Sequence, residues 1–248
     1  LFVRGYGELA LAGLVLNPNE EIRGVHRAGE QDLAEQTEVD LEMMPSPWLT
    51  KVIDIKTQKF VRWESQRGCP FKCGFCQHKE PGARLKKREF APKRINEEID
   101  LFCEYGVNDI AVLDPIFNAS SQSTPILQRF IANDYKGKLS LQCRAEMIDE
   151  EFLDTAGQLD IRLEFGLQTI HRNEGKAVSR NNNIDKVDRV LREVTKRGIN
   201  YEITLIYGLP EQSLESFKDT VSWCLNHNVP TIKAFPLMLL RGTDVANR

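Results

Sequence analysis

The sequence has no long apolar run and no strong excess of charge of either sign. The apolar stretch 234–240 is far shorter than the roughly 18 residues that a membrane-spanning helix needs, and Pro236 interrupts it. The 33 basic and 36 acidic residues give a net charge of −3, which disfavours binding of the whole molecule to nucleic acid or to an anionic membrane. We therefore expect no membrane partner and no bulk nucleic-acid substrate.

The chain also lacks a secretory signal, and it begins with Leu1 rather than Met. We therefore expect a cytoplasmic protein whose start has been trimmed. Its 41% hydrophobic and 28% charged residues are typical of a globular chain and not of a disordered one. A length of 248 residues allows one large domain or two small ones.

Residues 1–57 differ in pattern from the remainder of the chain. A strand at 1–4, an apolar helix at 9–16 and a short strand at 22–26 are expected, and Pro45-Ser46-Pro47 forms a rigid connector. These elements are too few to close a hydrophobic core of their own. We expect them to be the end of a domain whose beginning is absent.

From residue 58 onward, strands and helices alternate regularly. The expected strands are 60–66, 109–113, 139–145, 161–167, 199–207 and 231–238, and the expected helices are 92–104, 123–133, 149–157, 184–196 and 214–226. This alternation predicts parallel βαβ units, in a complete or partial α/β barrel or in an open doubly wound sheet. Both architectures bind ligands at the carboxyl ends of their strands.

Three of the six cysteines fall within eight residues. Cys69, Cys73 and Cys76 have the spacing CxxxCxxC in a loop directly after the first expected strand. Three thiolates so close together suit a soft metal. The other three cysteines stand singly in apolar contexts and are expected in the core: Cys103, Cys143 and Cys224.

Three kinds of site fit this cysteine spacing. A disulfide with a spare thiol is disfavoured in a chain without secretory features. Structural zinc needs a fourth ligand, for which His78 is available, but zinc sites usually pair two short hairpins. A [4Fe–4S] cluster has four irons, so three cysteines leave one iron open to a substrate or cofactor. The iron–sulfur cluster is the favoured interpretation.

The cysteine spacing, with Phe75 directly before the third cysteine and the position after the first strand of an α/β barrel, resembles the radical SAM superfamily. The resemblance implies that Cys69, Cys73 and Cys76 bind a [4Fe–4S] cluster, and that S-adenosylmethionine (SAM) chelates the open iron. In that family, reductive cleavage of SAM yields methionine and a 5′-deoxyadenosyl radical that abstracts hydrogen from a substrate. Phe75 is then expected near the adenine.

Two later segments sharpen the resemblance. Residues 164–169, followed by Arg180, are similar to the fourth-strand pattern of the branch that contains oxygen-independent coproporphyrinogen dehydrogenase and cobalamin-linked radical SAM enzymes. There the matching Gln168 and Arg180 help to bind the ribose and the methionine carboxylate. The plain alternatives are a backbone hydrogen bond for Gln168 and a solvated loop charge for Arg180.

Residues 205–210 are similar to the fifth-strand turn of the same branch. The resemblance implies that Tyr207 and Leu209 contact the cofactor, and Gly208 allows the backbone to approach it closely. Gln142 and Arg144, at the end of the third strand, are further candidate contacts.

The role of Arg144 has a plain alternative. Arg144 and Glu146 could form an exposed salt bridge, and such pairs contribute little stability. After the second strand, the sequence departs from the paired glycines of many family members, and Asp114 is the candidate acceptor for the methionine ammonium group.

The segment after the cysteines is basic. His78, Lys79 and the run 84–88 form either a solvated face or a contact for a substrate or a reductant protein.

The N-terminal segment also has a counterpart. Residues 5–8 with the following helix and connector resemble the end of the cobalamin-binding type of Rossmann-like domain. We therefore expect such a remnant at 1–57 and the radical SAM core, a partial (β/α)6 TIM-type barrel, at 58–248. Cobalamin is implied by this resemblance alone, since the nucleotide loop and lower-ligand histidine of such domains are not in the chain.

Together these features predict a radical SAM enzyme that acts on a small molecule or peptide and takes electrons from a donor such as flavodoxin or ferredoxin. Radical methylation is the favoured outcome. The alternatives are an oxidation, a rearrangement or a 3-amino-3-carboxypropyl transfer, and, from a different class, a non-catalytic metal-binding module.

Overall fold

The computed structural model describes residues 1–31, 35–37, 39–77, 87–240 and 242–247. The chain divides into two compact units, Leu1–Pro45 and Ser46–Arg248. The division falls within the predicted connector, and the boundary predicted after residue 57 lies inside the larger unit. Trp48 belongs to the larger unit because its ring packs edge-on against Phe102, with the centroids 5.6 Å apart.

The smaller unit contains β1 (Phe2–Val3), α1 (Glu8–Leu16), β2 (Val25–His26) and the 3-10 turn Leu41–Met43. Helix α1 ends at Leu16, and its C-cap residue Asn17 lies directly before a proline. Strands β1 and β2 pair antiparallel, whereas the strands of a Rossmann-like βαβ unit pair in parallel. The Rossmann-like origin of this segment therefore stays a prediction.

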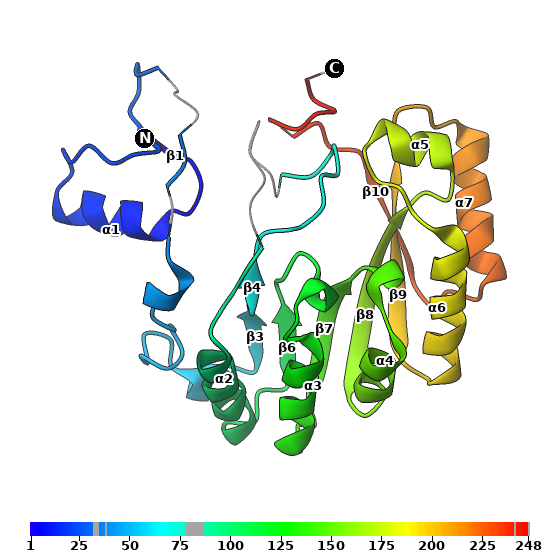
Figure 1. Cartoon of the computed structure of the whole chain (residues 1–248), viewed down its shortest axis with the longest axis horizontal. Helices are drawn as coiled ribbons and strands as arrows, with labels where there is room; N and C mark the ends of the chain where they lie inside the picture. The colour runs from blue at the N-terminus through cyan, green and yellow to red at the C-terminus, as the bar shows by residue number, and fades with distance from the viewer. Residues whose placement is uncertain (32–34, 38, 78–86, 241, 248) are drawn as a thin grey trace. The chain divides into compact units, whose positions relative to one another are not determined.

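The larger unit is built on a six-stranded sheet (Figure 1). Its strands are β3 (Phe60–Trp63), β6 (Asp109–Val112), β7 (Lys138–Cys143), β8 (Asp160–Gln168), β9 (Asn200–Tyr207) and β10 (Ile232–Pro236). All neighbours pair in parallel in the order β10-β9-β8-β7-β6-β3, which confirms the predicted α/β class. Within the described residues β3 and β10 do not pair with each other, so the sheet is an open, partial barrel.

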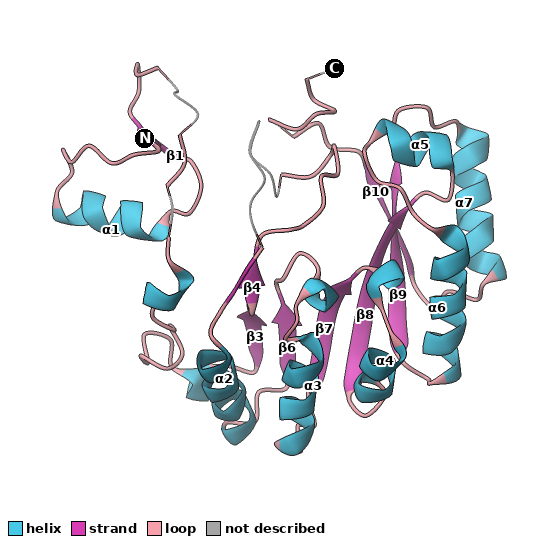
Figure 2. Cartoon of the chain, viewed as in Figure 1, coloured by secondary structure: helices cyan, strands magenta, loops and turns pink. Residues whose placement is uncertain are grey.

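The main helices lie along one side of this sheet (Figure 2). They are α2 (Pro92–Glu104), α3 (Ser123–Ala132), α4 (Glu150–Ala156), α6 (Ile184–Lys196) and α7 (Leu214–Asn226). Local signals fix their starts: Pro92 occupies the first turn of α2, and the Asp149 carboxylate accepts a hydrogen bond from Phe152 N. In the described part of the chain, none of the helices has the length and apolar character needed to cross a bilayer.

Alternation along the strands separates the two faces of the sheet. In β8, Ile161, Leu163 and Phe165 are buried, whereas Arg162 and Glu164 are only half-buried. The apolar set packs in the core, and the polar set points to the other face. Polar side chains of β8 and β9 therefore face the inside of the partial barrel.

The first expected strand is shorter than predicted. It ends at Trp63, and residues beyond it form β4 (Gln66–Arg67), which pairs antiparallel with β5 (Arg88–Glu89). The Asp114 carboxylate causes this break, because it accepts hydrogen bonds from the backbone N of Ser65 and of Gln66. Those groups then leave the parallel ladder.

Several shorter elements lay outside the sequence predictions. They are helix α5 (Arg172–Ala177) and the 3-10 turns Ile55–Thr57, Phe117–Ala119 and Ala145–Met147. The last of these turns ends β7 earlier than expected.

Candidate metallocofactor site

The three clustered cysteines lie in a hairpin whose stem is the β4–β5 pair. Cys69 and Cys73 are buried, and Cys76 is half-buried. Burial raises the pKa of the Cys69 thiol; the nearby Cys73 and Cys76 raise it further, and Arg180 lowers it. The three sulfurs and one guanidinium therefore lie within electrostatic range of one another.

The backbone of this loop is docked on the segment that follows α5. Gly74 N donates to Val178 O at 2.7 Å, and Gly74 O accepts from Val245 N at 3.2 Å. A Cβ at position 74 would lie 3.3 Å from Val178 O. The glycine therefore lets the loop approach the barrel closely.

Arg180 and Gln168 lie close together, with Arg180 beside the cysteine loop. Arg180 Nη1 lies 3.6 Å from Cys73 Sγ, and its Nη2 donates to Gly166 O. Gln168 has a φ of +70°, at the register irregularity of β8. A Cβ on Gly166 would come within 2.8 Å of Gln168 Nε2, so this glycine makes room for the amide.

Two atoms of this pair are buried without a partner among the described residues: Gln168 Oε1 and Arg180 Nε. Buried polar atoms are rarely left unpaired in proteins. The orphaned acceptor and donor, next to three soft thiols, fit a polar ligand held beside a metal cluster.

Two pockets meet at Gln168. One, of about 410 Å³, opens on the inner face of the sheet and is lined by Gln142, Arg144 and Arg180. The other, of about 480 Å³, is more apolar and is lined by Phe75, Cys76 and Ile206. Both are also lined by Thr204 and Phe235. A ligand with an apolar ring and a polar tail has room across this junction.

The two other third-strand candidates also lie here. Gln142 is exposed within the first pocket. The Arg144 guanidinium lies 3.9 Å from the centroid of the Phe71 ring, and its Nη2 donates to Asn181 O at 2.9 Å. The expected pair with Glu146 also forms, at 3.3 Å, so Arg144 links the cysteine loop to this rim.

Phe75 and Leu209 meet in one apolar cluster. Leu209 is buried with Val178 and Val245, and Phe75 packs against them. Tyr207 lies elsewhere, because its ring packs against Phe217 of α7 at 5.9 Å and lines neither pocket. The structure therefore brings Leu209, and not Tyr207, to the side of Phe75.

Asp114 itself lines neither pocket, although the next two residues, Pro115 and Ile116, line the first one. It is fully buried, and its carboxylate accepts from Ser65 Oγ as well as from the two backbone N–H groups. Burial raises its pKa to about 6, against the opposing effect of these hydrogen bonds. In the structure Asp114 therefore holds strand β4, and its contact with the methionine ammonium group stays a prediction.

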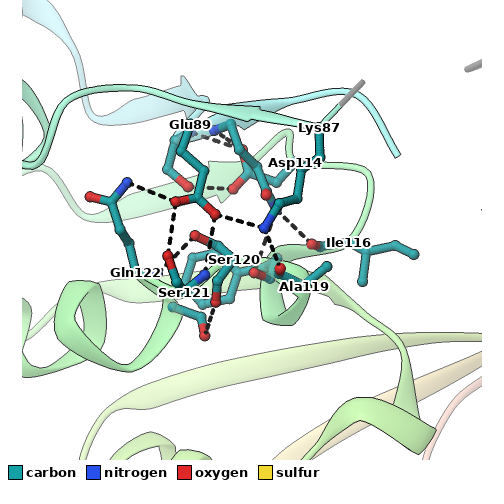
Figure 3. Close-up of polar contacts among 12 residues, drawn as sticks. Lys87, Glu89, Asp114, Ile116, Ala119, Ser120, Ser121 and Gln122 are labelled. Atoms are coloured by element: carbon teal, nitrogen blue, oxygen red, sulfur yellow. Dashed lines mark hydrogen bonds and ion pairs between the residues drawn. The ribbon is translucent and has the colours of Figure 1, made fainter. Parts of the chain in front are cut away.

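The second strand of the hairpin stem is anchored by Glu89 (Figure 3). Its carboxylate accepts from Lys87 Nζ at 2.7 Å, from Ser121 Oγ at 3.0 Å and from Gln122 Nε2 at 3.3 Å. Lys87 Nζ also donates to Ala119 O at 2.7 Å. Asp114 and Glu89 therefore tie the two strands of the stem to the same segment, 114–122.

Most of the basic segment lies outside the residues that the structure describes. This part comprises His78, Lys79 and residues 84–86. Lys87 is engaged in the stem contacts just described.

An acidic pair on the inner face of the sheet was not predicted from the sequence. Glu164 and Glu202 are register partners on β8 and β9, and Lys233 Nζ lies 2.5 Å from Glu202 Oε1. Burial, followed by the repulsion of Glu202, raises the pKa of Glu164. The alternation of polar and apolar residues along β8 and β9 could have predicted that both side chains share one face of the sheet.

The six cysteines fall into two groups, three in the loop and three elsewhere. None forms a disulfide. Cys143 and Cys224 are buried in the core, and burial raises the pKa of the half-buried Cys103 thiol to about 11. Among the described residues no three His, Cys, Asp or Glu side chains gather around a single metal ion. A four-iron cluster has four corners, so three cysteines fit it with one iron left open.

These features define a class of protein, a parallel α/β barrel that holds a cysteine-bound metallocofactor at the carboxyl ends of its strands. The pattern of the Radical SAM superfamily matches residues 63–224. The chain belongs to this superfamily, and membership implies a [4Fe–4S] cluster and SAM as cofactors.

Among curated relatives, the chain is similar to the cobalamin-dependent radical SAM methyltransferase TokK of Streptomyces tokunonensis. The two are 24% identical over 196 residues, which cover 71% of this chain and 28% of TokK. The chain therefore matches less than a third of the length of this relative.

Two solved structures share the fold. One is the radical SAM methyltransferase TsrM from Kitasatospora setae, with tryptophan and a SAM analogue bound. Its TM-score is 0.67 at 17% sequence identity, and the match covers 76% of this chain and 38% of the TsrM chain. The other is the coproporphyrinogen III oxidase HemN of Escherichia coli. Its TM-score is 0.62 at 17% sequence identity, and the match covers 84% of this chain and 51% of the HemN chain.

Proposed function

We propose that the chain is the core of a radical SAM enzyme that cleaves SAM reductively to modify a small molecule or a peptide. The observation that carries the proposal is the convergence of Cys73, Arg180 and Gln168, with two orphaned polar atoms at the junction of two pockets. A reduced [4Fe–4S] cluster, when bound, supplies the electron that breaks a sulfur–carbon bond of SAM.

The residues of this chain divide the work of binding. Cys69, Cys73 and Cys76 hold the cluster, and Arg180 offers its guanidinium to the cofactor carboxylate. Gln168 offers an amide acceptor to the ribose hydroxyls. Phe75 and the apolar pocket that it lines hold the adenine away from water. Gln142 and Arg144 border the space left for the substrate.

Radical methylation is the favoured outcome. TokK and TsrM are both named as methyltransferases, and TsrM has also been solved with cobalamin and a [4Fe–4S] cluster bound. Cobalamin is part of the proposal for the whole enzyme. An electron donor such as flavodoxin or ferredoxin completes the proposed system.

The products made from SAM test the methylation proposal. The anaerobically reconstituted protein is reduced with dithionite in the presence of SAM, cobalamin and candidate substrates, and the products are separated by chromatography. S-adenosylhomocysteine supports methylation. Methionine and 5′-deoxyadenosine without it indicate a non-methylating hydrogen abstraction, and methylthioadenosine indicates 3-amino-3-carboxypropyl transfer.

A further inference from the structure

Glu174 is a fully buried acid with no cation beside it. It lies in α5, is 0% exposed, and forms no ion pair within the described residues. Placing a carboxyl group in the interior without a cation is costly. Only specific contacts can offset that cost, so the partners of Glu174 indicate what it does.

All of its side-chain hydrogen bonds in the described structure converge on one oxygen. Oε2 accepts from Thr169 Oγ1 at 2.6 Å and from Gln212 Nε2 at 3.2 Å. The other oxygen, Oε1, is buried and has no hydrogen-bond partner among the residues that the structure describes. Glu174 therefore joins a residue that follows β8 to a residue that follows β9.

The first partner fixes the end of β8. Thr169 is 1% exposed and directly follows Gln168, whose positive φ turns the chain at this point. Its hydroxyl also accepts from His171 N at 3.0 Å. The Thr169 hydroxyl thus holds the turn that aims the Gln168 amide at the cofactor pockets.

The second partner fixes the end of β9. Gln212 Oε1 accepts from Gly208 N at 2.6 Å and from Leu209 N at 3.2 Å, and its amide nitrogen also donates to Ile206 O at 3.1 Å. Gly208 has a φ of +83°, so the turn needs such support. Gln212 thus holds the turn that presents Leu209 to Phe75.

We propose that Glu174 is a positioning residue for SAM: through Thr169 and Gln212 it holds two strand-end turns, one that aims the Gln168 amide at the cofactor pockets and one that packs Leu209 behind Phe75, which lines the more apolar pocket. The inference rests on the proposed function, because it names what sets the affinity of that same site. It assigns no chemical step to Glu174, which touches neither pocket.

The single-oxygen arrangement yields a matched pair of variants. In Glu174→Gln, the amide oxygen can take the place of Oε2 and accept both hydrogen bonds, while the NH₂ group takes the place of the unpartnered Oε1. In Glu174→Leu, both bonds are lost. The Thr169 hydroxyl loses its acceptor, and the Gln212 amide nitrogen keeps only its bond to Ile206 O. Thr169→Val has almost the same shape and removes the bond to Glu174 together with the bond from His171 N. It is the second variant should Glu174→Leu fold poorly.

The experiment is equilibrium binding of SAM to the anaerobically reconstituted, unreduced protein by calorimetry, with iron content and melting temperature measured on each sample. Glu174→Leu should weaken SAM binding roughly ten-fold and Thr169→Val roughly three-fold, both with full iron content. Glu174→Gln should bind within about two-fold of the original protein. Glu215→Gln, an exposed acid in the first turn of α7, is the control that should change nothing.

Three outcomes overturn the inference. Glu174→Leu with unchanged SAM affinity would show that the link does not position the cofactor. If Glu174→Gln binds SAM as weakly as Glu174→Leu, the oxygen that accepts from both Thr169 and Gln212 does not set the SAM affinity. Loss of iron along with SAM binding, in Thr169→Val as well, would show a general role in the fold. An unaltered protein that loads no cluster and binds no SAM would instead overturn the proposed function itself.

Discussion

Arg180 Nη1 lies 3.6 Å from Cys73 Sγ, although 107 residues separate the two in the chain. The contact joins the loop after the first strand of the sheet to the segment after α5. It places a fixed positive charge between the proposed cluster ligands and the orphaned amide of Gln168.

Replacing Arg180 with Lys should weaken SAM binding roughly ten-fold while the iron content is kept. Lysine retains the charge but cannot contact Cys73, Gly166 O and a carboxylate from one planar group. Calorimetry on the reconstituted protein measures the affinity, and Arg189→Lys on the exposed side of α6 is the matched control. Unchanged affinity in Arg180→Lys would show that Arg180 is only a solvated loop charge.

Replacing Cys73 with Ala should abolish both the cluster and SAM cleavage. Its thiol is one of three proposed ligands, and the described residues offer no substitute beside it. Cys103→Ala is the control, because that half-buried thiol lies in α2 and should be dispensable for iron binding. Retained cleavage in Cys73→Ala would refute its assignment as a ligand.

Replacing Glu89 with Gln should loosen the hairpin stem. Glu89 gathers Lys87, Ser121 and Gln122 around one carboxylate, and an amide cannot accept from all three. The variant should lose iron to a chelator several-fold faster than the original protein, as followed by the visible absorbance of the cluster. Glu97→Gln tests a carboxylate that forms only an exposed pair with Lys93, and it should lose iron at the original rate. Equal rates for Glu89→Gln would mean that the stem does not retain the cluster.

The buried Asp114 should make the stability of the apoprotein depend on pH. Its pKa in the folded state, about 6, lies above the ordinary 3.8, so between these values the folded state binds a proton that the unfolded state has lost. The stabilisation from this proton is full below about pH 4 and is lost as the pH rises through about 6. Asp114→Asn cannot titrate, so its free energy of unfolding relative to the original protein should rise across that window. Denaturant unfolding at several pH values measures this, and a constant difference would contradict it.

Much of the fold could be predicted because its signals are local. The bounds of α2, α6 and α7 follow from apolar periodicity, a proline at the first turn and capping residues, and these act within a few positions of the chain. The β4–β5 hairpin could not be predicted, because the break in the first strand depends on Asp114, which lies 49 residues beyond Ser65. Helix α5 has only six residues, one of them Gly175, too short for a clear period.

The site divides in the same way. Residues that carry the family pattern, such as Gln168 and Arg180, could be predicted, and the structure brings them together beside Cys73. The Glu174–Gln212 link could not, because it joins two turns that are 38 residues apart and has no spacing of its own. The alternation of β9 turns the Tyr207 side chain toward α7, and it lines neither pocket, so its contact with the cofactor stays a prediction.

The most direct test of the account is the metal content and SAM chemistry of one anaerobic preparation. Iron, sulfide and zinc are measured on the reconstituted protein, which is then reduced with dithionite and SAM and assayed for 5′-deoxyadenosine. The account predicts about four irons and four sulfides per chain, and 5′-deoxyadenosine that disappears in Cys73→Ala. Stoichiometric zinc, with two irons or fewer and no cleavage of SAM, would contradict it.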